Sequence, residues 1–95
     1  MTLEEFKQST SGSTPPEGIS NSLKALWYAH KEDWDQAHQW AQKEKDSESA
    51  WVHAYLHRQE GDILNAEYWY TRASRTLPDE TLHEEWEEIT KTLLS

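Results

Sequence analysis

Apolar residues recur along most of this chain with the three- and four-residue spacing that places side chains on one face of a helix. The first such stripe predicts a helix from Ser20 to about Lys31, and its members are Ile19, Leu23, Leu26, Trp27 and His30. The second stripe predicts a helix that begins after Asp33, and its members are Trp34, Ala37, Trp40 and Ala41. Gln36 follows Asp33 at the spacing of a capping box, which supports a helix start at this position.

The second half of the chain predicts three more helices, and the first of them is apolar on more than one side. This helix spans about residues 48–60, and its apolar members are Ala50, Trp51, Val52, Ala54, Tyr55 and Leu56. Such a pattern is typical of a central helix packed between neighbours. The next helix, predicted over 63–76, is expected to bury Ile63, Ala66, Trp69, Tyr70, Ala73 and Leu77. The last begins at Asp79 or Thr81, and its stripe consists of Leu82, Trp86, Ile89 and Leu93.

The first 18 residues lack this periodicity. The segment QSTSGSTPPEG is rich in Ser, Thr, Gly and Pro, a composition typical of extended or disordered chain. Leu3 and Phe6 precede this segment, and their docking onto the rest of the protein is the alternative. The sequence therefore predicts a flexible N-terminal arm over 1–18. It predicts an all-α domain over 19–95, because no segment there shows the period-two alternation of a strand.

The predicted helix pairs repeat one another. A shift of 29 residues places DWDQA of residues 33–37 on DILNA of residues 62–66. Within the second pair, small and turn-forming residues recur at the spacing of two helices folded back on each other: Ala54, Gly61, Ala66, Tyr70, Ala73 and Pro78. This spacing resembles the tetratricopeptide (TPR) helical hairpin. The run LKALWYAHKEDWDQAH, with AWVHAYLHRQEGD and NAEYWYTRA, is also similar to a group of short bacterial TPR-like proteins of unknown function.

The resemblance implies an architecture and a general role. It implies two antiparallel TPR-like hairpins followed by a C-terminal helix that covers the exposed end of the last one, which makes five helices. Because TPR hairpins are scaffolds that bind other molecules, the resemblance also implies a non-enzymatic module whose ligand is a protein or a peptide.

Composition and charge indicate what the core contains, where the protein is located and which kinds of partner it can bind. The chain is 35% hydrophobic, and its six Trp and four Tyr supply large rings to a small core. It has no cysteine, and its start, MTLEEFKQ, does not read as a signal peptide, so we expect a cytoplasmic protein. A net charge of −9 argues against direct binding to nucleic acid or to an anionic membrane, and it favours basic protein surfaces. Formation of a homo-oligomer is compatible with all of these features.

The third predicted helix indicates where a peptide could bind. Trp51 and Tyr55 are four residues apart, with Arg58 one turn further along. An aromatic pair beside an arginine can grip an extended peptide and hold a carboxylate through a charge-assisted hydrogen bond. The resemblance implies a concave groove whose residues are Leu26, His30, Trp51, Tyr55, Arg58 and Gln59. The alternative is that Trp51 and Tyr55 pack against the first helix.

A small metal-dependent enzyme is the alternative from another functional class. His53 and His57 are four residues apart on one helical face, a spacing that can share a metal ion, and His30 could come near them. The zinc-protease motif needs a Glu directly after the first His, where this chain has Ala54. No Cys, Asp or Glu completes a site on this face, and no nucleophile or phosphate-loop motif is present. We therefore expect packed imidazoles, with no metal, no cofactor and no catalytic residue.

The last predicted helix has an acidic face formed by Glu80, Glu84, Glu87 and Glu88. Like charges at four-residue spacing cost an isolated helix about 0.2–0.5 kcal/mol per pair. Such a face can dock on a basic protein or mimic nucleic-acid phosphate. The alternative is that it serves solubility.

Overall fold

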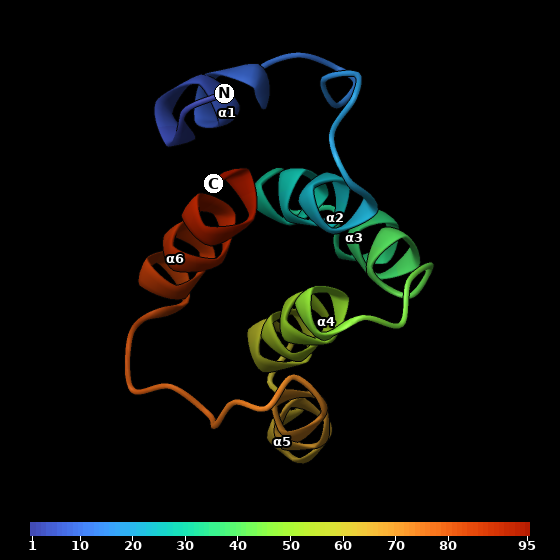
Figure 1. Cartoon of the computed structure of the whole chain (residues 1–95), viewed down its shortest axis with the longest axis vertical. Helices are drawn as coiled ribbons and strands as arrows, with labels where there is room; N and C mark the ends of the chain where they lie inside the picture. Colours follow the sequence, from blue (N-terminus) through green and yellow to red (C-terminus); the bar gives the residue numbers. More distant parts are fainter.

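Six α-helices and the loops between them make up the computed structural model, which describes the whole chain, residues 1–95 (Figure 1). The helices are α1 (Leu3–Ser9), α2 (Asn21–His30), α3 (Trp34–Ala41), α4 (Ser47–Gln59), α5 (Ile63–Arg72) and α6 (Leu82–Leu94). No residue lies in a strand, which confirms the predicted all-α class. α2 packs along α3 and α4 along α5, while α6 lies against both α2 and α4. None of the six helices has the length and apolar character needed to cross a bilayer.

Polar side chains cap the five helices from α2 to α6, and the caps at Ser20, Asp33 and Thr81 stand at helix starts that the sequence predicts. In each case the capping oxygen accepts a hydrogen bond from the backbone N–H three residues further on, and the caps are Ser20, Asp33, Asp46, Asp62 and Thr81. Each bond satisfies one of the N–H groups that a helix start leaves unpaired. At Thr81 the Glu84 side chain returns the bond and completes a capping box. At Asp33 only the first of the two bonds is present, so the capping box predicted with Gln36 is incomplete.

Left-handed residues end three of the helices. Gly61 closes α4 with φ 88°, and Glu32 occupies the equivalent place after α2 with φ 62°. Glycine adopts this region freely, whereas a side chain at Glu32 meets a steric cost. Ser74, with φ 60°, has the same effect after α5. The helix predicted over 63–76 therefore ends at Arg72, since a left-handed residue cannot continue a right-handed helix.

The N-terminal segment is not the flexible arm that its composition predicts over 1–18. Residues Leu3–Ser9 form α1, and the whole segment has a defined position, so the fold has six helices instead of the expected five. α1 packs against α6, where Phe6 is fully buried and its ring centroid lies 6.0 Å from that of Trp86. Leu3 packs against the same core. The alternative of docking through Leu3 and Phe6 is therefore the one observed.

Residues 10–20 have no helical structure, but polar bonds tie the start of this segment to α2. The Lys31 ammonium donates to the backbone oxygen of Thr10 at 2.8 Å. It also donates to the backbone oxygen of Gly12 at 2.6 Å, and the Trp27 indole N–H donates at 3.1 Å to the hydroxyl of Ser9, the last residue of α1. The Ser-, Gly- and Pro-rich composition thus predicts the absence of helix here, while hydrogen bonds from Lys31 at the end of α2 hold the first residues of the segment.

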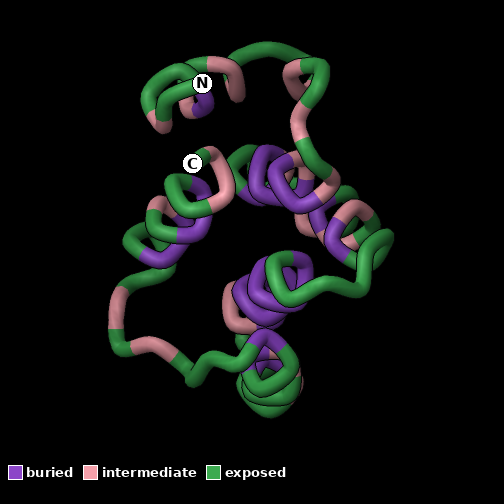
Figure 2. The backbone as a smooth tube through the Cα atoms, in the orientation of Figure 1, coloured by how far each residue is buried: buried purple, intermediate pink, exposed green.

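α4 is the central helix, as its broad apolar surface predicts. Every residue from Ser49 to His57 is buried, and Figure 2 shows α4 surrounded by the other buried segments. α2, α3, α5 and α6 all pack against it. Side chains from four other helices therefore meet around this one helix.

Several residues predicted to be buried are in fact partly or largely accessible. The indoles of Trp34, Trp40 and Trp69 are only partly buried at the margin of the core. Ile63 and Leu77 are exposed. α5 packs mainly on α4, so the side of α5 that faces away from α4 has no neighbouring helix to cover it.

Candidate functional site

The face of α4 assigned to a peptide groove is covered by α6. Trp51 and Tyr55 are each only 4% exposed, and Leu26 is fully buried. The Leu26 backbone oxygen accepts a hydrogen bond from the Trp86 indole at 2.9 Å, and the His30 ring lies 4.4 Å from the Trp86 ring. The structure therefore brings most of the predicted groove residues together, but around the last helix of the same chain and not along an open surface.

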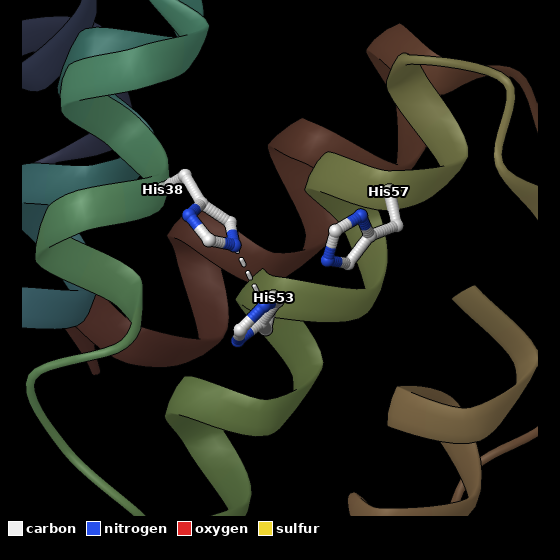
Figure 3. Close-up of side chains that lie close together, drawn as sticks. All are labelled: His38, His53 and His57. Atoms are coloured by element: carbon white, nitrogen blue, oxygen red, sulfur yellow. Dashed lines mark hydrogen bonds between the residues drawn. The ribbon is translucent and has the colours of Figure 1, made fainter. Parts of the chain in front are cut away.

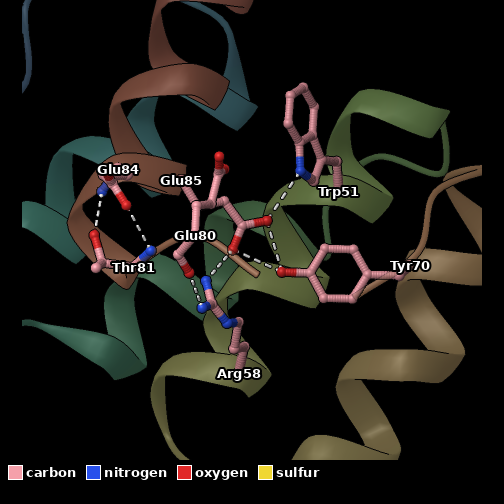
Figure 4. A network of polar contacts seen from close by, with 7 residues as sticks. All are labelled: Trp51, Arg58, Tyr70, Glu80, Thr81, Glu84 and Glu85. Carbon is pink, nitrogen blue, oxygen red and sulfur yellow. Dashed lines mark hydrogen bonds and ion pairs between the residues drawn. The ribbon is translucent and has the colours of Figure 1, made fainter. Parts of the chain in front are cut away.

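The centre of this contact is the carboxylate of Glu85, which is 1% exposed (Figure 4). The Trp51 indole N–H donates to one of its oxygens at 3.2 Å. Arg58 Nη1 donates to the other at 2.9 Å, and the Tyr70 hydroxyl lies 2.7 and 2.6 Å from the two oxygens. An aromatic residue beside an arginine does hold a carboxylate here, and that carboxylate belongs to α6.

The polar groups around the Glu85 carboxylate are held by further hydrogen bonds and by burial. Arg58 Nη2 also donates to the backbone oxygen of Glu80, which ties the loop before α6 to α4. Burial raises the pKa of Tyr55 to about 12. Burial, followed by the hydrogen bond to Glu85, raises the pKa of Tyr70 as well, so both hydroxyls stay protonated at neutral pH. Gln59 is half-buried next to Arg58, and its Oε1 has no hydrogen-bond partner.

Two members of the predicted acidic face are already engaged within the chain. Glu84 completes the capping box at Thr81, and these hydrogen bonds lower the pKa of its carboxyl group. Glu87 forms an ion pair with Lys7 of α1, and this contact lowers the pKa of Glu87. His83 lies 3.1 Å from the same carboxylate. This part of the face is therefore partly neutralised.

The other two members interact with each other. The pKa of Glu80 is raised to about 7, chiefly by the neighbouring Glu88 carboxylate and then by burial. Glu88 itself is exposed. Because Glu80 is partly protonated at neutral pH, the face carries less negative charge than four free carboxylates.

A separate cluster of three imidazoles lies between α3 and α4 (Figure 3). His38 comes from α3, and His53 and His57 come from α4. One ring nitrogen from each lies within 4.8 Å of the others, and the Nε2 atoms of His38 and His53 are 3.0 Å apart. The third member is therefore His38, whereas His30, which the sequence suggests, lies against Trp86.

Tryptophan rings hold two of these imidazoles. Trp34 stacks on His38 with ring centroids 4.8 Å apart and an interplanar angle of 11°. Trp69 stacks on His53 at 3.8 Å and 9°. This packing restricts the rotation of both imidazoles, so their nitrogens have defined directions.

The third imidazole is oriented by a carboxylate. His57 Nδ1 lies 2.7 Å from the Glu60 carboxylate, and in the neutral ring a proton on Nδ1 that bonds Glu60 leaves the lone pair on Nε2. The Asn65 amide nitrogen lies 3.4 Å from this Nε2. The contact with Glu60 therefore favours the tautomer in which the lone pair of Nε2 faces the Asn65 amide and could instead accept a metal ion.

The cluster favours neutral imidazoles. Burial lowers the pKa of His53 to about 4, and the adjacent His38 and His57 act in the same direction. Burial is also the main cause of the lowered pKa of His38. Both side chains are therefore uncharged at neutral pH.

The metal-free protein is expected to lose stability as the pH falls from about 6.5 toward 4. The unfolded chain protonates His53 near its ordinary pKa of 6.5, whereas the folded protein does so only near 4. Acid therefore favours unfolding within this window, and above pH 6.5 the full contribution of neutral His53 is present. Urea unfolding in the presence of a chelator, repeated across this range, measures the slope.

The matched variants for this measurement are His53→Gln and His83→Gln. The first should make the dependence on pH less steep, with a remainder from His38, while the second should leave it unchanged, because the His83 side chain is 66% exposed on α6. Identical slopes for wild type and His53→Gln would contradict the prediction.

A pocket of about 240 Å³ opens beside His53. It is lined by Gln42, Glu44, Lys45, Asp46, Ser49, Ala50, His53, Trp69 and Arg72. Of the three clustered histidines, only His53 lines this pocket. On this side of the cluster, solvent in the pocket therefore contacts the His53 ring alone.

Sequence reasoning missed two residues, His38 and Glu85. His38 stands four residues after Trp34, so the two share one helical face. Glu85 stands between Leu82 and Ile89 at spacings of three and four, which places a carboxylate on the buried stripe of α6. Both signals are present in the sequence, but only the packing of α3 and α6 on α4 shows what these side chains meet.

Comparison with known proteins does not extend this description. No family model, curated protein or solved structure matches the chain.

Proposed function

We propose that the protein is a non-enzymatic interaction module, in which two TPR-like hairpins capped by α6 bind a protein or peptide partner. The hairpins are α2 with α3 and α4 with α5, and the packing of these consecutive helices supports the proposal. The left-handed residues Glu32 and Gly61, at equivalent places in the two turns, support it further. α6 covers the side of α4 and α2 that a concave face would otherwise expose.

The outer face of α5 is the surface that we propose for the partner. α5 packs inward through Ala66 and Tyr70, while Leu64 and Tyr68 are 83% and 54% exposed. These two side chains are four residues apart and are neighbours on the helix surface. Arg72, one turn further, donates to the Tyr68 hydroxyl at 3.2 Å. This exposed Leu–Tyr–Arg stripe is the observation that carries the proposal.

Acidic residues beside the stripe indicate the chemistry of the partner. Glu60, Asp62 and Glu67 are exposed at the start of α5 and along it, in a chain of net charge −9. Apolar side chains with an acidic surround complement a partner that presents apolar residues among lysines and arginines. An amphipathic basic helix has this character.

The predicted groove is a less favourable place for the same partner. Binding there requires displacement of α6, and with it the buried bonds of Glu85 and the burial of Trp86. The acidic face of α6 remains an alternative for a basic partner or for mimicry of nucleic-acid phosphate. Two of its four carboxylates are already bonded within the chain. The outer face of α5 needs no such rearrangement.

Selection from a display library of random peptides tests this proposal with the purified full chain. We expect enriched peptides to combine apolar residues with Lys and Arg. Their affinity should fall about tenfold or more for the double variant Leu64→Glu with Tyr68→Ser, because both contacts are lost from the centre of the surface. Both positions are exposed, so circular dichroism should show an unchanged fold.

The matched control is the double variant Glu84→Gln with Glu88→Gln, which changes only the acidic face of α6 and should retain the peptides. Peptides that bind the α5 variant as tightly as wild type would rule out the α5 surface, and so would a selection without enrichment. Loss of binding in the α6 variant alone would assign the interaction to that helix. A homodimer that dissociates in the α5 variant during sedimentation would replace the proposed partner by a second copy of the chain.

A further inference from the structure

The imidazole cluster between α3 and α4 shares no ligand nitrogen with the Leu64, Tyr68 and Arg72 stripe, and its geometry supports an inference of its own. We infer that His38, His53 and His57 bind one divalent transition-metal ion, with zinc as the best match. Imidazole nitrogens suit zinc, copper, nickel and cobalt, whereas magnesium and calcium prefer oxygen ligands. Three histidines with a fourth position open to water are a familiar ligand set for zinc.

The distances between the nitrogens are close to those of a bound site. Zinc holds imidazole nitrogens at about 2.0–2.1 Å, so two of them at a tetrahedral angle lie about 3.3–3.4 Å apart. The Nε2 atoms of His38 and His53 are already 3.0 Å apart, and the third nitrogen lies within 4.8 Å of both. Small rotations of the rings therefore bring all three into range of one ion.

The hydrogen bond from His57 to Glu60 supplies the outer contact that metal-binding histidines usually have. A ligating imidazole donates its second N–H to a carboxylate or carbonyl, which fixes the tautomer and strengthens the ligand. His57 Nδ1 lies 2.7 Å from the Glu60 carboxylate, so its Nε2 is the nitrogen available to the metal. Figure 3 shows the three rings gathered in the space between α3 and α4.

The rings are also held in position from outside the cluster. Trp34 stacks on His38 and Trp69 stacks on His53, so these two imidazoles have little rotational freedom to lose when a metal ion binds. In the present arrangement one of the two Nε2 atoms of His38 and His53 must carry a proton to bond the other. A metal ion would replace that single bond by three metal–nitrogen bonds, and the donating ring would stay neutral because its proton moves from Nε2 to Nδ1.

Zinc titration of the purified, chelator-treated full chain tests the site. Calorimetry at neutral pH should show one ion per chain, and the melting temperature should rise with zinc concentration, because the folded form alone presents the three nitrogens together. Cobalt(II) serves as a spectroscopic probe, since a tetrahedral site gives intense visible absorption bands. An excess of magnesium should change neither result.

Three variants distinguish metal binding at the three histidines from adventitious binding elsewhere on the protein. His38→Gln removes a ligand at a half-exposed position and should abolish the cobalt bands. Glu60→Gln keeps all three ligands and should weaken zinc binding about 10–100-fold, through the outer contact alone. His83→Gln, on the exposed surface of α6, should behave as wild type.

The inference is overturned if wild type shows no saturable zinc binding. Equal affinity or equal cobalt bands in wild type and His38→Gln would overturn it as well. If circular dichroism shows that His38→Gln does not fold, Glu60→Gln decides, and zinc affinity and cobalt bands identical to wild type would then count against the site. Failure here would leave the α5 surface unaffected, because the peptide selection is performed without metal.

Discussion

Trp86→Ala is expected to lower the free energy of unfolding by about 3–5 kcal/mol, as for other buried tryptophans. Trp86 is 2% exposed, and its ring packs against Phe6 of α1 and His30 of α2. Its indole N–H also bonds the Leu26 backbone oxygen, which the substitution leaves unsatisfied. Because three helices lose a shared contact, the expected loss is a large fraction of a total free energy of unfolding of about 5–15 kcal/mol.

Urea unfolding followed by circular dichroism measures this loss, and Trp40→Ala is the matched control. Trp40 is only partly buried, and its exposed part lies beneath Lys24 and Lys43, so its removal should cost clearly less. Equal losses for the two variants would show that Trp86 does not join α1, α2 and α6.

Glu85→Ala is expected to cost about 3–5 kcal/mol, the range found when one partner of a buried ion pair is removed. The substitution leaves Arg58 without its counter-ion, and it leaves the Tyr70 hydroxyl and the Trp51 indole without their acceptor. Arg58 is only partly buried, so water relieves some of this cost and places the effect toward the lower end.

The control for this variant is Glu88→Ala, one turn further along α6 at an exposed position, with an expected change within about 0.5 kcal/mol. A double-mutant cycle with Arg58→Ala isolates the pair. Once Arg58 is absent, loss of Glu85 should cost less, because no uncompensated cation remains. Additive effects would show that the two side chains are not coupled.

Local chemistry was enough to predict most of the helix boundaries. A cap and its N–H partner are three residues apart, so Ser20, Asp33 and Thr81 mark helix starts whatever lies around them. The broad apolar surface of α4 likewise predicts its central position. α5 ends earlier than predicted because Ser74 adopts a left-handed conformation, which the identity of this residue does not predict.

In the predicted groove, the sequence indicates which side chains bind a carboxylate but not where that carboxylate comes from. Trp51 and Arg58 do bind a carboxylate, as their proximity in the sequence suggests. That the carboxylate is Glu85 of the same chain depends on the return of α6 across α4, a contact between residues more than 25 positions apart. No local pattern determines such a contact, because it depends on which helices leave a face uncovered.

The amino-acid sequence by itself determined the all-α class, the helix starts and the acidic, tryptophan-rich character of this protein, since these follow from interactions within one or two turns. Only the tertiary structure decided that Phe6 docks on Trp86 and that His38 joins His53. The physical reason is that burial and long-range contacts depend on the sum of all helix packings. A composition that favours disorder, as in residues 1–18, is overridden when one aromatic ring finds a site on a distant helix.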